Sequence, residues 1–270
     1  MQKIVFNAHY LMYLDTAITD YWRALALPYE ETMRQLGGDL YVKKSSVEYV
    51  ASARFDDVLD IGLTCNKVGN SSVIFEGAIF CGDKLLVRAE LVYVFADPVK
   101  QTSKPVPQAL RAVLAAYEAG ESMTVLKVGD WQTLGFDAGK VRKQVFVVEQ
   151  QIPESEEWDA ADAAAVHAVI YNRLGAALAT GRLLVAGPQI AKIGRMASAK
   201  VLRSRGLGRS VLHALLGKAE DRGDAQVVLH AQRRAAAFYA KAGFVEQGPT
   251  FDEVGIAHVE MVKILKPLPV

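Results

Sequence analysis

The segment RSRGLGRS, at residues 203–210, combines two glycines with three arginines and leads directly into the helical pattern VLHALLGKAEDRG. Glycines let a backbone approach a ligand closely, and the first turn of a helix presents free N–H groups with a favourable dipole. The loop therefore predicts a binding site for a phosphate group. Taken alone, the same pattern is also compatible with a tight turn between a strand and a helix.

Two nucleotide-binding motifs fit this loop poorly. A nucleotide P-loop ends in Gly-Lys-Ser or Gly-Lys-Thr, whereas this loop ends in Gly208-Arg209-Ser210. A dinucleotide fingerprint needs a third glycine and an acidic residue at the end of the next strand. Here position 211 is Val, and the next strand pattern ends in LHAQ. We therefore expect a different phosphate-bearing molecule.

The second half of the chain alternates strand and helix patterns around this loop. A strand begins at Thr124, and a helix is expected from Asp137, as its N-cap, to Gln150. Strands are expected at 164–171, 176–185 and 190–197, and after the loop come a helix, the strand QVVLHAQ, the helix RAAAFYAKAGF and a last strand near IAHVEMVKIL. This order predicts a mixed α/β domain whose central strand leads into the glycine loop.

The first half of the chain shows one long helical pattern followed by strand patterns. Apolar residues recur at helical spacing from Tyr10 to Leu25. Strand-type alternation follows at 59–66, 73–81 and 85–95, with turn signals between the segments. One long helix beside an antiparallel meander implies a sheet curled around that helix.

A closing helix and a short polar segment mark the boundary between the two halves. The helix is expected from Pro107 to Ala119, and the segment AGESM precedes the strand that begins at Thr124. We therefore expect one domain at residues 1–121 and a second at 124–270.

The motifs IGRMAS, RSRGLGRSVLHALL, VVLHAQ and AAAFYAKAGF, in this order, resemble the GNAT family of N-acetyltransferases from about Thr124 to the end of the chain. The segments KQVFVVEQQIPESEEWDAADAAAVH and DEVGIAHVEM further resemble its ElaA-like branch. The resemblance implies that the loop holds the pyrophosphate of acetyl-CoA and that the preceding strand pairs with the pantetheine. The implied CoA-binding residues are Met196, Ala197, Arg203, Ser204, Arg205, Gly206, Leu207, Gly208, Arg209 and Ser210.

Acetyl transfer to an amine needs a deprotonated amine, a polarised carbonyl and a proton donor for the departing thiolate. Tyr239 matches the family's usual proton donor, although an aromatic side chain there could simply pack its helix on the sheet. Two alternatives stand for the base. Glu149 would act as the base if it borders the acceptor cleft, and would otherwise be a solvated carboxylate. His258 would act as the base because it matches a histidine of the ElaA-like branch, and would otherwise be a hydrogen-bonded strand residue.

The remaining polar features of this half are expected to have no catalytic role. His167 and His230 are expected to be structural, and His213 to lie on an exposed helix face. The acidic run ESEEWDAAD is expected to be a solvated loop, with the alternative that it attracts a cationic amine.

The segment KIVFNAHYLMYLDTAITDYW resembles the start of the 4-hydroxybenzoyl-CoA thioesterase family, which has the hotdog fold. The resemblance implies an acyl-CoA thioesterase whose sites form across a dimer interface, and hence a homodimer or tetramer. Asn7 and His9 match positions that flank the substrate thioester, although both could be polar caps of the helix. The family's catalytic Asp would precede Met1, so either the chain starts late or this carboxylate is lost; Asp15 is a weaker substitute.

The composition narrows the classes of function. Lys+Arg 31 against Asp+Glu 30 gives a net charge of +1, which disfavours nucleic acid as a partner. Cys65 and Cys81 show no metal-ligand spacing, so we expect two reduced cysteines and no metal. No apolar run approaches the ~18–20 residues that cross a bilayer, and the N-terminus does not read as a signal peptide. These features predict a cytoplasmic protein without a membrane segment.

The sequence therefore predicts a hotdog domain followed by a GNAT domain, both of which use coenzyme A thioesters. The preferred function is transfer of an acetyl group from acetyl-CoA, as cosubstrate rather than bound cofactor, to a small-molecule amine. The alternatives are acyl-CoA hydrolysis as the main activity, and a non-catalytic module for acyl-CoA binding or dimerisation.

Overall fold

The computed structural model describes residues 3–265. The chain folds into two compact units, Met1–Met123 and Thr124–Val270. Each unit has its own sheet, one of four strands and one of seven.

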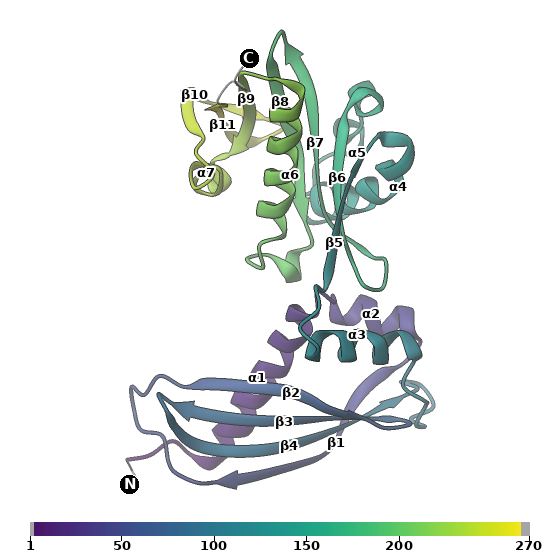
Figure 1. Ribbon diagram of the computed structural model, residues 1–270, viewed down its shortest axis with the longest axis vertical. Coiled ribbons are helices and arrows are strands. Elements are labelled where there is room, and N and C mark those ends of the chain that lie inside the picture. The colour runs from purple at the N-terminus through teal and green to yellow at the C-terminus, as the bar shows by residue number, and fades with distance from the viewer. Residues whose placement is uncertain (1–2, 266–270) are drawn as a thin grey trace. The chain divides into compact units, whose positions relative to one another are not determined.

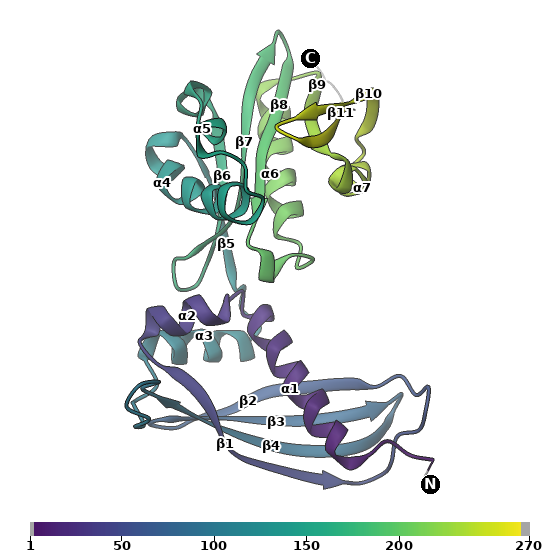
Figure 2. The same ribbon diagram turned by 180° about the vertical axis from the view of Figure 1, so that it is seen from behind.

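The first unit is a four-stranded antiparallel sheet packed on one long helix. The helix is α1 (Asn7–Ala24), and the sheet has the order β1-β4-β3-β2. Figure 2 shows α1 lying across this sheet. The strands are β1 (Asp39–Tyr49), β2 (Asp60–Val68), β3 (Ser72–Cys81) and β4 (Lys84–Ala96), and two further helices are α2 (Tyr29–Leu36) and α3 (Gln108–Glu118). This arrangement confirms the hotdog fold.

The buried face of α1 explains why the helix fits the sheet so closely. Tyr10, Leu14 and Ile18 recur at helical spacing and are buried. On β3, Gly77 faces this row, because a Cβ at that position would lie 2.8 Å from Leu14 Cδ2. A larger residue at 77 would therefore push the helix away from the sheet.

Two elements of the first unit, α2 and β1, were missing from the sequence prediction. The strand β1 reads DLYVKKSSVEY, with four consecutive polar residues and a register shift between Val42 and Lys44. This bulge breaks the alternation on which strand prediction depends. The helix α2 spans only eight residues, too few for a clear helical period.

The second unit is a mixed sheet with helices on both faces. Its strand order is β10-β11-β9-β8-β7-β6-β5, and all neighbours are antiparallel except β8 and β9. The strands are β5 (Thr124–Gly129), β6 (Val166–Asn172), β7 (Ala177–Gly187), β8 (Ile190–Ser198), β9 (Gln226–Gln232), β10 (Val245–Glu253) and β11 (Ile256–Ile264). This architecture confirms the expected GNAT fold.

The helices of the second unit cover opposite faces of the sheet. Both α4 (Trp131–Arg142) and α6 (Leu207–Arg222) contact β6, β7 and β8, and they lie on different sides of the sheet in Figures 1 and 2. The shorter helical segments are η1 (Lys143–Glu149), α5 (Glu154–Glu157), η2 (Ala160–Ala164), η3 (Lys200–Leu202), η4 (Arg233–Ala235) and α7 (Ala236–Ala240).

The start of α4 was predicted wrongly. The N-cap is Asp130, whose carboxylate accepts a 2.8 Å hydrogen bond from the Thr133 amide. Asp137 instead lies inside the helix and accepts a 2.9 Å hydrogen bond from the Tyr171 hydroxyl. An aspartate is a favoured N-cap at either position, so residue type alone does not distinguish the two starts. Strand β10 was also missed, because its side chains are mostly exposed and it contains Gly248 and Pro249.

No helix among residues 3–265 is long and apolar enough to cross a membrane.

Candidate active site

The central feature of the second unit is the divergence of its two parallel strands. Strands β8 and β9 pair only over Ile190–Lys192 and Gln226–Val228, although both strands continue for several residues. The carboxyl ends of two parallel neighbours therefore separate, which is where open α/β sheets bind their ligands.

The glycine loop follows β8 and leads into α6. Gly206 is the N-cap of α6 with φ of 85°, a left-handed conformation that favours glycine. At Gly208, an added Cβ would lie 3.6 Å from the Phe238 ring of α7. The loop thus combines the N-terminus of a sixteen-residue helix with a close approach of α7.

The predicted loop residues occupy distinct places around this turn. Ser204 has φ of 68°, and the Ser210 hydroxyl donates a 3.3 Å hydrogen bond to the Gly206 carbonyl. Leu207, the first residue of α6, is buried, whereas Arg205 and Arg209 are exposed. The arginines thus lie on the solvent side, where an anion could reach them.

A β-bulge precedes the loop at the predicted pantetheine strand. Thr180 pairs with Ala197 and Arg182 with Gly194, so two residues of β8 lie opposite one residue of β7, and the first of the two, Arg195, takes φ of 52°. Gly181 lies opposite the bulge, because a Cβ there would meet Met196 Sδ. Met196 and Ala197 therefore lie on the irregular part of β8, beyond its last pair with β9.

Two of the predicted site residues bind each other. Arg203 donates from both terminal nitrogens to Glu149, with distances of 2.7 Å to each carboxylate oxygen. The hydrogen bonds from Arg203 lower the pKa of the Glu149 carboxyl. Glu149 is therefore neither a freely solvated carboxylate nor a strongly basic one, and it lies beside the glycine loop.

Tyr239 lies on α7, next to Phe238, which approaches the loop. Its side chain is 8% exposed, and burial raises the pKa of its hydroxyl to about 12. The ring packs edge-on against Phe238 and Phe244. Both interpretations of the residue therefore remain consistent with its position, since it packs a helix and also keeps its proton at neutral pH.

His258 lies near the carboxyl end of β9, on the neighbouring strand β11. It is paired in register with Gln232, the last residue of β9, and its Nδ1 donates to the Ile256 carbonyl at 2.8 Å. Gln232 in turn donates a 2.9 Å hydrogen bond to Gln150, which follows η1. This contact joins η1 to β9 next to the diverging strands.

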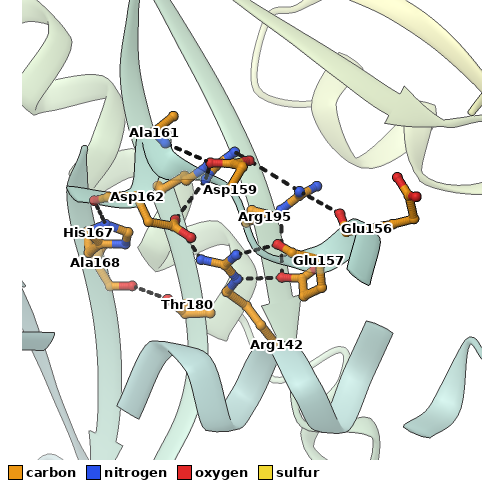
Figure 3. Close-up of polar contacts among 11 residues, drawn as sticks. Arg142, Glu156, Glu157, Asp159, Ala161, Asp162, His167, Ala168, Thr180 and Arg195 are labelled. Atoms are coloured by element: carbon orange, nitrogen blue, oxygen red, sulfur yellow. Dashed lines mark hydrogen bonds and ion pairs between the residues drawn. The ribbon is translucent and has the colours of Figure 1, made fainter. Parts of the chain in front are cut away.

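The acidic run was expected to be a solvated loop, and this expectation is wrong for two of its residues. Glu157 and Asp162 are buried, and both bind Arg142, which is itself 1% exposed (Figure 3). Asp159 binds Arg182 at 2.6 Å. Sequence reasoning missed this network because its arginines come from three separate elements.

The network reaches the β8 bulge through Arg195. Its guanidinium donates a 3.1 Å hydrogen bond to the Glu156 carbonyl and lies 3.4 Å from Asp159 (Figure 3). His167 is buried and its Nε2 lies 2.9 Å from the Asp162 carbonyl, as expected for a structural histidine. Ion pairs of Arg195 thus add to the apolar packing around the bulge.

The first unit places Asn7 and His9 in the first turn of α1. Both are exposed, and the Asn7 carbonyl accepts a 3.1 Å hydrogen bond from the Tyr49 hydroxyl of β1. The His9 ring contacts Phe6 and Tyr13. Asp15, further along the helix, is exposed as well. The side chains of Asn7 and Asp15 make no hydrogen bond with one another within the described part of the chain.

Among residues 3–265, no group of three His, Cys, Asp or Glu side chains could hold a metal ion.

Comparison with known proteins matches the two units to two different families. Residues 137–265 match the acetyltransferase (GNAT) domain, and residues 2–88 match the thioesterase superfamily. The uncharacterized N-acetyltransferase YjcF of Bacillus subtilis is 35% identical over 47% of this chain and 90% of its own length. The acyl-CoA thioester hydrolase YbgC of Escherichia coli is 29% identical over 40% of this chain and 81% of its own length.

The second unit is also similar to a solved N-acetyltransferase structure. The crystal structure of a candidate N-acetyltransferase from Lactobacillus plantarum is 27% identical, covers 54% of this chain and 100% of its own, and has a TM-score of 0.51. The second unit therefore shares its fold with acetyltransferases.

Proposed function

Because the chain belongs to the GNAT acetyltransferase family through residues 137–265, we propose that it transfers an acetyl group from acetyl-CoA to a small-molecule amine. The chain also carries a thioesterase-superfamily segment at residues 2–88. Both families act on acyl-CoA thioesters. The divergence of β8 and β9, with the glycine loop at the end of β8, is the observation that carries this proposal.

In this proposal the pyrophosphate lies at the N-terminus of α6, contacted by residues 203–210, and the pantetheine runs along Met196 and Ala197. Free N–H groups of the first helical turn suit an anion, and the helix dipole adds to the attraction. Arg203 would exchange its bond with Glu149 for one with the phosphate, which accepts the same two-pronged contact.

Tyr239 is the proposed acid for the thiolate that leaves. Burial keeps its hydroxyl protonated at neutral pH, and α7 adjoins the loop that would hold the cosubstrate. Tyr239→Phe should lower kcat by about 10²-fold or more while acetyl-CoA binds as before. An unchanged kcat would leave Tyr239 with its packing role alone. Glu149 and His258 remain the bases predicted from the sequence.

Gly208→Glu tests the assignment of the loop. The new carboxylate would occupy the place of the phosphate, and the backbone tolerates a side chain there, because the nearest atom to an added Cβ lies 3.6 Å away. Gly217→Glu, on the same helix with open space around it, is the matched control. Calorimetry should show acetyl-CoA binding lost in the first variant and kept in the second. Equal affinities would refute the assignment.

A second function, acyl-CoA hydrolysis by the first unit, is favoured by its match to the thioesterase superfamily. Asn7 would orient the thioester carbonyl and His9 would flank it. Thiol release from a panel of acyl-CoA substrates without any amine should then be measurable and should fall in Asn7→Ala and His9→Ala. Thiol release that occurs only with an amine present would assign all turnover to the second unit. Binding of acyl-CoA without any turnover would indicate a non-catalytic acyl-CoA sensor.

We also propose that the first unit forms a homodimer or a tetramer. Its two edge strands are β1 and β2, and Phe55 and Val58, just before β2, are 90% and 79% exposed. Large exposed apolar side chains at a free sheet edge favour association. Light scattering at several concentrations should give a mass of at least twice 29.4 kDa, and a monomer would contradict the proposal.

A further inference from the structure

His230 lies on β9, beyond the last residue that pairs with β8, and on the same face of the strand as Gln232. The last paired residue of β9 is Val228, and alternate residues of a strand share a face. Since Gln232 is bound to Gln150 after η1, this face lies on the η1 side of the sheet. His230 therefore stands beside the opening between the diverging strands.

Two carboxylates flank the imidazole of His230. Nδ1 lies 3.4 Å from Glu253 of β10, and Nε2 lies 3.8 Å from Glu260 of β11, which is its direct partner in the strand register. The Phe251 ring meets the His230 ring edge-on with centroids 5.0 Å apart. The histidine, the two glutamates and the phenylalanine form one cluster, here called the His230 cluster.

The charges of the His230 cluster are not balanced by basic side chains. In the described part of the chain, neither Glu253 nor Glu260 contacts a lysine or an arginine, in contrast to Asp159 and Asp162. The cluster therefore carries a net negative charge whether His230 is protonated or neutral. An aromatic ring beside two carboxylates suits an organic ammonium group.

We propose that the His230 cluster is the acceptor subsite of the transferase: it receives an alkylamine as its ammonium ion, and His230 takes the first proton. This inference rests on the proposed function and adds the class of acceptor and the base. The other candidate histidine, His258, is 9% exposed with Nδ1 bonded to a carbonyl, whereas the His230 side chain is 31% exposed.

The protons and bonds of this step balance. The ammonium gives one proton to His230, which passes it to solvent, and Glu253 and Glu260 stabilise the imidazolium in between. The neutral nitrogen attacks the acetyl carbonyl, so that a C–N bond forms as the C–S bond breaks. The thiolate takes a proton from Tyr239, and the second proton lost by the nitrogen restores the tyrosine through water.

The test compares acceptors that differ in charge. An alkylamine is protonated at neutral pH, whereas hydroxylamine is neutral and needs no initial deprotonation. His230→Gln should lower kcat/KM for the alkylamine by about 10²-fold or more and change hydroxylamine acetylation little. Added imidazole should partly restore the alkylamine rate. The double variant Glu253→Gln, Glu260→Gln should raise KM for the alkylamine by about tenfold and affect hydroxylamine less.

Two variants control for the loss of a histidine or a carboxylate elsewhere. His213 is exposed on α6, and Glu246 of β10 forms an ion pair with Arg233 of η4. His213→Gln and Glu246→Gln should therefore acetylate both acceptors at the wild-type rate. Equal losses for both acceptors, or none, in His230→Gln would overturn the inference. If the wild type binds acetyl-CoA but acetylates neither acceptor, the proposed transferase function fails and the inference falls with it.

Discussion

In the proposed site, the ion pair between Arg203 and Glu149 would affect how readily the glycine loop accepts an anion. Arg203 offers both terminal nitrogens to the carboxylate, the same geometry that a phosphate would require. If acetyl-CoA binds at this loop as we propose, it competes with Glu149 for Arg203. The pair is a feature of the site that the sequence could not reveal, since the two residues are 54 positions apart.

Glu149→Gln should tighten acetyl-CoA binding, because a neutral amide competes less well for Arg203. The expected decrease in Kd is about 1.4- to fivefold, which corresponds to the ~0.2–1 kcal/mol of an exposed ion pair. Glu154→Gln, which breaks the exposed pair with Lys143, is the control and should leave Kd unchanged. Calorimetry measures both, and weaker binding in Glu149→Gln would contradict the competition.

At the scale of elements, the hairpin between β10 and β11 is strained at its tip. Val254 and Gly255 connect the strands with φ of 53° and 76°. Positive φ at both central residues is typical of a type I′ turn, in which Asn-Gly is favoured and a β-branched residue is unfavourable. The strained residue directly follows Glu253 of the His230 cluster.

Val254→Asn should therefore stabilise the second unit by about 0.5–1 kcal/mol, because asparagine tolerates the left-handed conformation. Little apolar burial is lost, since Val254 is 45% exposed. Val245→Asn, at an exposed and extended position of the same hairpin, should bring no gain. Urea unfolding measures the free energy of unfolding of both variants. Equal changes at the two positions would exclude strain in the turn as the cause.

The buried charged network depends on Arg142 at the end of α4. Arg142 binds both Glu157 and Asp162 and is sandwiched by Trp131 and Trp158. Arg142→Met keeps much of the side-chain volume but leaves Asp162 with Arg182 alone and Glu157 with Arg195 alone, at 3.6 Å, which should cost about 3 kcal/mol. Lys143→Met, which removes only an exposed pair, should cost less than about 1 kcal/mol. Similar losses in the two variants would contradict the burial argument.

At the scale of the whole molecule, both units carry carboxylates that favour folding in their charged form. Hydrogen bonds from Arg182 lower the pKa of Asp159 to about 2, against 3.8 for the free side chain. In the first unit, burial opposes the charge of Glu118, but hydrogen bonds from Cys65, Thr64 and Tyr21 outweigh it and lower the pKa. Both groups bind protons more weakly in the folded chain than in the unfolded chain.

Stability should therefore be highest above about pH 4.5 and fall as the pH drops towards about 2, because the unfolded chain takes up these protons first. Glu157 acts in the opposite sense, since burial raises its pKa. Thermal unfolding across this range should show Tm falling with pH, and Asp159→Asn should flatten the fall. A wild-type Tm that stays constant would refute the linkage.

Strong periodicity and ordered motifs made much of the fold predictable. The strand QVVLHAQ was predicted residue for residue, because apolar alternation is a local signal. The helical pattern VLHALLGKAEDRG was also found, although α6 begins four residues earlier, at Leu207. The bulged strand β1 lacked such a signal. The partners of Glu149, Glu157 and His230 lie on distant elements, so only the folded chain could show which charges meet.

The buried network has a consequence for how the loop from Glu154 to Ala164 can move. Glu157, Asp159 and Asp162 anchor this loop to arginines of α4, β7 and β8. If the loop swung open alone, Arg142 would remain buried without a counter-charge, so opening should require the whole unit to loosen. In hydrogen exchange, the amides of this loop should be as slow as those of the sheet. The segment would then be a fixed part of the second unit rather than a lid that opens and closes.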